Sequence, residues 1–313
     1  MKKVFLAISL IICTLISCQQ NKVEKNTLGK ETTTNEVTFY TKDSIKVFGD
    51  LHIVNKTATT LLIFHQGGSN TRGEYKTIIP VLVEKGHNVL AIDQRVGGQV
   101  YGNYNRTVAN MSSNNFNYCD AYPDLEAALN YILENNFSGK KIVWGSSYSG
   151  SLAVKLANQY QDKIDGVLAF SPASGGPLQP CKADNYFETL KLPLLLLRPK
   201  QEMQRESSKN QFALAKENGH QTYIAENGVH GSSLLVKDRA QNNTEKNWNA
   251  VFTFLNKIKN EYKKKNETKL VSFFFKIDYR HRVSLQFRPK YFLLLYRLFR
   301  FVAPSLKLFR PIY

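Results

Sequence analysis

Between residues 60 and 265, short apolar runs alternate with longer segments in which apolar residues recur every three or four positions. The short runs predict buried parallel strands, because both faces of a strand must be apolar when helices cover them. These runs lie at 60–65, 88–93, 141–144, 166–170, 193–197 and 222–225. The periodic segments predict amphipathic helices at 73–85, 121–135, 150–160, 207–218 and 245–265. The alternation of strand and helix predicts an α/β fold with a doubly wound, mostly parallel sheet.

A different pattern precedes this alternation. Residues 36–40 and 45–54 have alternating or β-branched character, and Lys42, Asp43 and Ser44 separate them, so we expect an antiparallel hairpin at the start of the sheet. Two connections, 96–117 and 173–190, are longer than such a fold needs. Both are polar and have too few apolar positions for a large cap domain with its own core, so we expect them to form the walls of a pocket.

The first residues have the features of an export signal. Lys2 and Lys3 precede an apolar run at 4–16 that is too short to span a membrane. The following Leu-Ile-Ser-Cys, ending at Cys18, resembles the lipobox of bacterial lipoproteins. The resemblance implies removal of residues 1–17, acylation of Cys18 by chains such as palmitate, and a membrane-anchored protein of the bacterial cell envelope that faces the periplasm or the cell surface. The alternative is an ordinary signal in which Cys18 is incidental.

Composition separates a polar tether and a basic tail from the body of the chain. Residues 18–35 are rich in Asn, Thr and Lys and predict a flexible tether, which leaves 36–263 as a single domain and 264–313 as a tail. Residues 263–313 carry 13 Lys and Arg against two acidic residues, so 11 of the net charge of +17 lies there and only +6 elsewhere. The body therefore has no charge pattern that indicates nucleic acid binding. We interpret the tail as an extension outside the functional domain. The alternative is an amphipathic segment that lies at the membrane interface.

The strongest chemical motif is Gly145-Ser146-Ser147-Tyr148-Ser149, which lies between a predicted strand and a predicted helix. It follows the G-x-S-x-G pattern of a nucleophile elbow, in which a sharp turn presents a serine hydroxyl above the sheet. Ser149 replaces the last glycine but is also small. The alternative is a serine-rich turn in which Ser147 only caps the helix.

A serine nucleophile needs a base, and the base needs an orienting acid. His230 lies in a glycine-flanked loop directly after the last predicted strand, and Glu202 lies a few residues beyond the strand at 193–197. The order Ser147, Glu202, His230 is the one expected of a triad on this kind of sheet. Asp93 and Glu206 are the alternative acids.

Two backbone N–H groups should stabilise the developing oxyanion. One is expected from Tyr148, the residue after the nucleophile. The other is expected from the turn His65-Gln66-Gly67-Gly68, with the N–H of Gly67 favoured over that of Gln66. We expect His65 to hold this turn by hydrogen bonds.

Together with the segments 91–95, 169–172 and 229–231, these motifs make residues 36–263 resemble the α/β-hydrolase superfamily, in particular its small dienelactone-hydrolase-like esterases. The resemblance implies a serine hydrolase that forms an acyl-enzyme with a small-molecule ester or amide, without cofactor or metal. A peptidase or amidase of the same fold and a non-catalytic binding lipoprotein are the alternatives. Asp93 and Arg95 are expected as a polar pair that supports the active-site loops. Whether Cys119 and Cys181 form a disulfide or remain thiols, and the oligomeric state, are left open.

Overall fold

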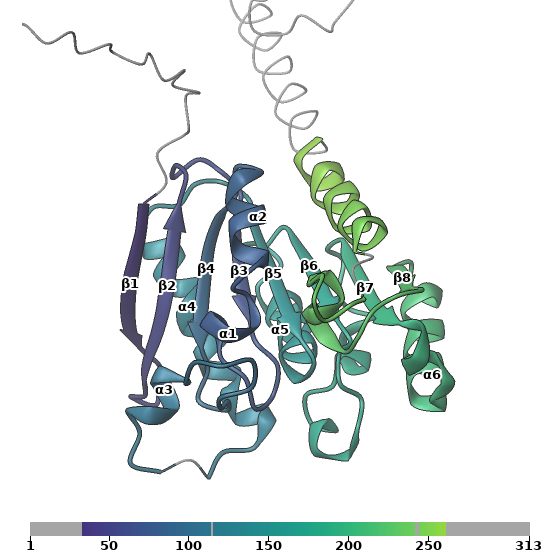
Figure 1. Ribbon diagram of the computed structural model, residues 1–313, viewed down its shortest axis with the longest axis horizontal. Coiled ribbons are helices and arrows are strands. Elements are labelled where there is room, and N and C mark those ends of the chain that lie inside the picture. Colours follow the sequence, from purple (N-terminus) through teal and green to yellow (C-terminus); the bar gives the residue numbers. More distant parts are fainter. Residues whose placement is uncertain (1–32, 114, 242–243, 261–313) are drawn as a thin grey trace, which may run out of the picture. The chain divides into compact units, whose positions relative to one another are not determined.

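The computed structural model describes residues 33–113, 115–241 and 244–260, which form an eight-stranded sheet with helices on both faces (Figure 1). The strands lie in the order β1-β2-β4-β3-β5-β6-β7-β8. Their bounds are β1 (Thr33–Tyr40), β2 (Lys46–Ile53), β3 (Thr60–Phe64), β4 (Asn88–Asp93), β5 (Lys141–Ser146), β6 (Gly166–Phe170), β7 (Leu194–Pro199) and β8 (Gln221–Ala225). The predicted fold class is confirmed.

The N-terminal hairpin is the antiparallel part of the sheet. β1 pairs antiparallel with β2, and β2 pairs antiparallel with β4, whereas all remaining neighbours are parallel. β1 begins at Thr33, which pairs with Ile53. The predicted tether of 18–35 was therefore too long at its C-terminal end, because backbone pairing extends the strand over polar residues. Residues 1–32 and 261–313, with the predicted signal, Cys18 and the tail, lie outside the described residues.

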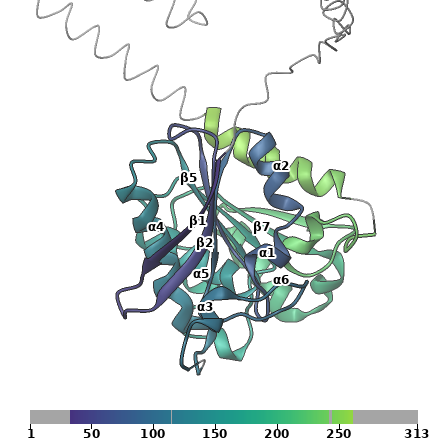
Figure 2. The ribbon, with the colours of Figure 1, turned by 60° about the vertical axis from the view of Figure 1, so that its left-hand side comes forward.

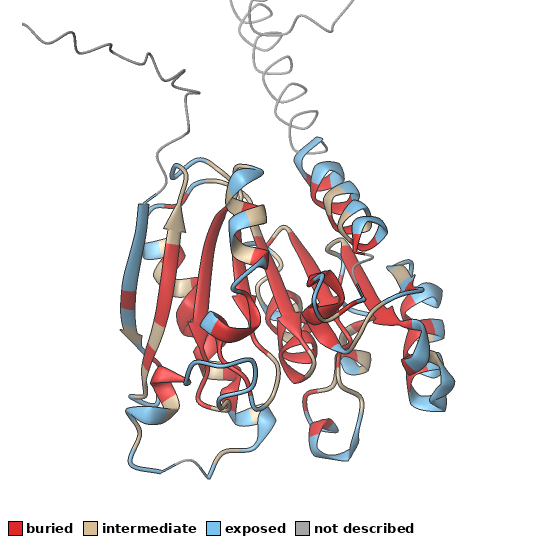
Figure 3. Ribbon diagram, in the orientation of Figure 1, coloured by how far each residue is buried: buried red, intermediate tan, exposed pale blue. Residues whose placement is uncertain are grey.

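Two layers of helices cover the sheet (Figure 2). α4 (Tyr122–Glu134), α5 (Tyr148–Gln159) and α6 (Glu206–Glu217) pack into the core on one face. α2 (Ile78–Glu84) and a helix over residues 245–260 pack into the core on the other face. The central strands are buried between these layers (Figure 3), which explains their unbroken apolar sequences.

The helix predicted at 73–85 is wrong as a single element. The structure has α1 (Thr71–Glu74), a break, and then α2. Pro80 accounts for the break, because its ring would clash with the carbonyl of Lys76 in a continuous helix. The Tyr75 hydroxyl also donates a hydrogen bond of 2.8 Å to the carbonyl of Phe64, which holds the break against the end of β3.

The two long connections contain short helical turns. The first includes α3 (Arg106–Ala109) and leads to the 3₁₀ turn η1 (Tyr118–Ala121), and the second includes η2 (Gly176–Leu178) and η3 (Ala183–Tyr186). Within the described ranges no helix combines the length and the apolar character needed to cross a bilayer.

Candidate active site

Ser147 lies in a sharp turn between β5 and α5. Its φ of 59° and ψ of −121° are rare for a residue with a side chain and are the strained geometry of a nucleophile elbow. The strain is held by backbone hydrogen bonds on both sides, since Ser147 N–H donates to the Phe170 carbonyl (2.8 Å) and Ala173 N–H donates to the Ser147 carbonyl (3.1 Å). Ser147 is half-buried, whereas its neighbours Ser146 and Tyr148 are buried.

The residues that flank Ser147 explain the small side chains of the motif. A Cβ at Gly145 would overlap the carbonyl oxygen of Ser149, so only glycine fits there. Ser149, which replaces the usual glycine, is fully buried and donates to the His65 carbonyl (2.6 Å), while the side chain of Gln94 donates to Ser149 Oγ (2.5 Å). The substitution therefore ties the start of α5 to the turn after β3.

His230 and Glu202 are joined by a hydrogen bond, as the predicted triad requires. His230 Nδ1 lies 2.6 Å from Glu202 Oε1, and Arg198 Nη1 donates to Glu202 Oε2 at 2.6 Å. Burial by itself would raise the pKa of Glu202, but the hydrogen bond and charge of His230, together with Arg198, outweigh burial and hold this pKa below its ordinary value. Glu202 is therefore a carboxylate at neutral pH, and its hydrogen bond favours the tautomer of His230 that has its proton on Nδ1 and a lone pair on Nε2.

The loop that carries His230 is fastened to the strands beside Ser147. Gly231 N–H donates to Ser171 Oγ (3.1 Å) and Ser232 N–H donates to Ser146 Oγ (3.0 Å). Ser146 directly precedes Ser147, so these bonds hold the loop that carries His230 at the turn between β5 and α5. Within the described ranges no hydrogen bond joins Ser147 Oγ to His230, a contact that in many hydrolases tightens only when substrate binds.

The alternative acids lie elsewhere. Asp93 is buried, accepts from Thr71 Oγ1 (2.8 Å) and pairs with Arg106 (2.7 Å). The side chain of Glu206 is 76% exposed and faces Lys209. Neither carboxylate bonds to His230, whereas Glu202 does.

The expected oxyanion turn is held as a unit. His65 is fully buried, and its Nδ1 lies 2.8 Å from the Gln66 carbonyl while its Nε2 accepts from Gln94 N–H (3.0 Å). Burial lowers the pKa of His65, so this side chain is a neutral structural bridge. Among the described residues, the N–H groups of Gly67 and Tyr148 have no hydrogen-bond partner, whereas Gln66 N–H donates to Glu74 Oε2 (2.8 Å). The free donors are therefore Gly67 and Tyr148.

Glu74 is a residue of this region that the sequence reasoning missed. It is fully buried in α1, and burial raises its pKa to about 7, although the hydrogen bond from Gln66 N–H opposes the shift. Its Oε1 has no partner in the described part of the chain. Glu74 is the last residue of α1, before the break that separates α1 from α2, so its burial follows from the packing of α1 against the turn after β3 and not from a periodic pattern in the sequence. Through the hydrogen bond from Gln66 N–H, the Glu74 side chain fixes the expected oxyanion turn to α1.

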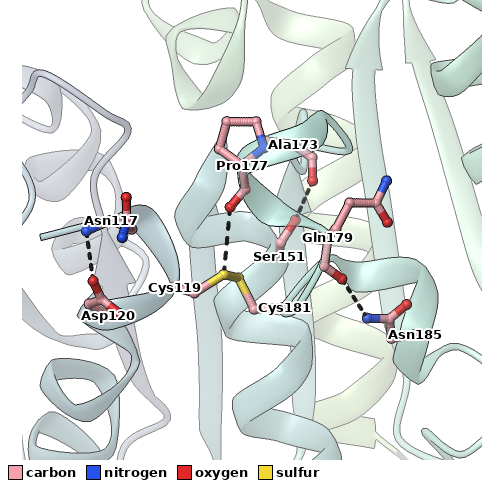
Figure 4. The surroundings of a disulfide bond; sticks show 9 residues. All are labelled: Asn117, Cys119, Asp120, Ser151, Ala173, Pro177, Gln179, Cys181 and Asn185. Carbon is pink, nitrogen blue, oxygen red and sulfur yellow. Dashed lines mark hydrogen bonds between the residues drawn. A yellow bond between two sulfur atoms is a disulfide. The ribbon is translucent and has the colours of Figure 1, made fainter.

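The two long connections are joined by a disulfide (Figure 4). Cys119 in η1 bonds to Cys181, between η2 and η3, across a sequence separation of 62 residues. The second connection is also tied to α5, because Ser151 Oγ donates to the Ala173 carbonyl (2.8 Å). The disulfide settles the question that the sequence left open and joins the two segments expected to wall the pocket.

Asp93 and Arg95 do not pair with each other, contrary to the simplest form of the prediction. Asp93 supports α1 and α3 through Thr71 and Arg106. Arg95 is fully buried, pairs with Asp124 of α4 (2.7 Å) and also contacts Asp43. Each residue fastens a different segment to the end of β4, so both have structural roles. Within the described ranges no group of three or more His, Cys, Asp or Glu residues is placed to hold a metal ion.

Solved structures share this fold. The Pyrococcus furiosus esterase Pf2001 superposes with a TM-score of 0.55 at 18% identity, covering 72% of this chain and 91% of that protein. The dienelactone hydrolase from Anabaena variabilis gives 0.50 at 16% identity over 64% of this chain and 88% of that one. The Pyrococcus horikoshii acylaminoacyl peptidase gives 0.51 at 14% identity over 69% of this chain and 40% of its own length.

Comparison with protein-family models identifies the family, whereas the solved structures show only the fold. No curated protein matches the chain significantly. The model of the family described as serine aminopeptidase, S33, matches residues 55–233, which include Ser147, Glu202 and His230. This match spans more than half of the 313 residues. The chain therefore belongs to the S33 serine aminopeptidase family of α/β-hydrolases.

Proposed function

We propose that this hydrolase cleaves carboxylic esters of small molecules through an acyl-enzyme on Ser147, with His230 as the base and Glu202 as the orienting acid. The observation that carries the proposal is the 2.6 Å pairing of Glu202 with His230 Nδ1 in a loop that is hydrogen-bonded to Ser146, beside the strained elbow. A buried carboxylate, an imidazole and an elbow serine in this order are what acyl transfer needs.

In the proposed mechanism, His230 Nε2 takes the proton of the Ser147 hydroxyl as Oγ attacks the acyl carbon. Glu202 stabilises the imidazolium that forms, and Arg198 keeps Glu202 ionised. The N–H groups of Gly67 and Tyr148 donate to the oxyanion of the tetrahedral intermediate. His230 then returns its proton to the leaving alcohol, and a water activated by the same imidazole hydrolyses the acyl-enzyme.

The state of two carboxylates, Glu202 and Glu74, supports an ester substrate over a peptide with a free amino terminus, despite the family's name. An aminopeptidase needs a carboxylate that can hold the α-ammonium group of its substrate. Glu202 is engaged by His230 and Arg198, and Glu74 is fully buried beneath the oxyanion turn, so neither is available for that task. A neutral acyl group needs no such partner.

The test is hydrolysis of a matched panel by the full chain: p-nitrophenyl acetate, butyrate and octanoate against aminoacyl p-nitroanilides. We expect turnover of short esters that Ser147→Ala abolishes, and turnover of the anilides at least 100-fold slower. Faster cleavage of the anilides would favour a peptidase. A folded protein that hydrolyses none of these substrates would favour a non-catalytic binding role.

We also infer that the enzyme is exported and lipid-anchored through Cys18 in the bacterial cell envelope. The lipobox-like sequence supports this inference, and so does the Cys119–Cys181 disulfide, because disulfides persist mainly in oxidising compartments. Metabolic labelling with an alkynyl palmitate should mark the protein, and Cys18→Ser should remove the label. Labelling that persists in that variant would refute Cys18 as the acylated residue.

A further inference from the structure

Tyr118 packs against both residues that carry the free oxyanion donors. A Cβ placed on Gly67 would lie 3.1 Å from both Cε1 and the hydroxyl oxygen of Tyr118, so the phenol lies directly beside the Cα of Gly67. On its other side, the Tyr118 ring lies 4.9 Å from the ring of Tyr148, centroid to centroid. These contacts place the Tyr118 phenol against both residues whose backbone N–H groups are free, beside Gly67 and next to the ring of Tyr148.

The hydroxyl of Tyr118 is available for a substrate. In the described part of the chain it has no hydrogen-bond partner, and Tyr118 as a whole residue is 37% exposed to solvent. The neighbouring tyrosines are committed, because Tyr148 donates to the Val96 carbonyl (2.7 Å) and Tyr75 donates to the Phe64 carbonyl (2.8 Å). Tyr118 thus presents a donor that the fold does not use.

The position of Tyr118 is held independently of its hydroxyl. Cys119, the next residue, is bonded to Cys181, and η1 begins with a capping box in which Asn117 N–H donates to Asp120 (2.7 Å). The ring also rests on Tyr148, which is fully buried. A donor that is held in place before the substrate arrives needs little reorganisation when negative charge develops.

We propose that Tyr118 donates its phenol O–H to the acyl oxygen in the transition state, as a third oxyanion donor beside the N–H groups of Gly67 and Tyr148. The inference rests on the proposed serine esterase function. The phenol keeps its proton throughout: it stabilises the negative charge of the oxyanion and leaves the proton transfers to His230. One oxyanion donor contributes roughly 100- to 1,000-fold to kcat, and partial exposure to water puts Tyr118 at about 10- to 100-fold.

The test compares Tyr118→Phe with wild type in the full chain, using p-nitrophenyl butyrate and a trifluoromethyl ketone that forms a tetrahedral oxyanion adduct with Ser147. We expect kcat to fall about 10- to 100-fold with KM within about twofold, and the affinity for the ketone to fall by a similar factor. Tyr40→Phe is the matched control, since Tyr40 is 68% exposed on β1 at the far edge of the sheet.

The outcomes separate the inference from the proposed function. Unchanged ketone affinity in Tyr118→Phe overturns the third donor even if kcat falls, because a residue that only shapes the wall does not contact the oxyanion. Ester turnover that depends on Ser147 but not on Tyr118 also overturns it and leaves the esterase standing. Absence of any Ser147-dependent turnover in wild type refutes the esterase, and the inference with it.

Discussion

Replacing Glu202 by glutamine should reverse the hydrogen bond to His230. Arg198 Nη1 donates to Glu202 Oε2 at 2.6 Å and requires an acceptor there, so the amide oxygen of the glutamine will face Arg198. Its NH₂ group then points at His230 Nδ1, which must accept instead of donate. The imidazole proton moves to Nε2, where it blocks removal of the proton from Ser147. Loss of the productive tautomer costs about 10⁴-fold in kcat, or about 5.5 kcal/mol of transition-state stabilisation.

The assay is kcat and KM for p-nitrophenyl butyrate with Glu202→Gln, measured on protein shown to be folded by circular dichroism. Glu206→Gln is the matched control, because Glu206 lies four residues on and is largely exposed. Arg198 is buried and loses its charged partner, so the variant should also be less stable by about 2 kcal/mol. A folded Glu202→Gln enzyme that keeps more than a tenth of wild-type kcat would refute the assignment of Glu202.

Three further changes test the surroundings of the site. Burial raises the pKa of Glu74 from its ordinary 4.5 to about 7, so the folded state favours the protonated form and Glu74 lowers the free energy of unfolding as pH rises through this range. Relative to wild type, the free energy of unfolding of Glu74→Gln in urea should therefore increase by about 3 kcal/mol between pH 4.5 and pH 8. An equal difference between the two proteins at both pH values would contradict this. Reducing the Cys119–Cys181 bond, which closes 62 residues, should lower the free energy of unfolding by about 4 kcal/mol in the chain-entropy model, and an unchanged urea midpoint would count against it. Ser149→Ala should lower the free energy of unfolding by about 1–3 kcal/mol, because it leaves the buried His65 carbonyl and the Gln94 amide without their hydrogen-bond partner. A melting temperature equal to that of wild type would show that these bonds are dispensable.

The sequence was sufficient for the strands and for the residues that follow them. All six predicted parallel strands occur in the sheet. The predicted burial on both faces is wrong for β8, because it is the edge strand and only its last residue, Ala225, is buried. Ser147 and His230 could be placed because each follows a strand, and the carboxyl ends of parallel strands share one edge. Glu202 could be chosen over Asp93 only provisionally, because a loop residue's direction depends on packing.

Other features depended on contacts that no local pattern records. Glu74 and Tyr118 matter because α1 and η1 pack against the turn after β3, and each contact joins segments distant in the sequence. The pairing of Cys119 with Cys181 required the paths of two long connections, whose length and polar composition predict no conformation. The break between α1 and α2 could have been predicted, since Pro80 is a local signal that helical periodicity masked.

Labelling of the full chain with a fluorophosphonate, followed by intact mass and peptide mapping, tests the central claim most directly. The account predicts one covalent adduct on Ser147 in native protein, and none in Ser147→Ala or in heat-denatured wild type, because only the assembled triad activates that hydroxyl. A folded wild-type protein that takes no label, or a label that persists in Ser147→Ala, would contradict the assignment of Ser147 as the nucleophile.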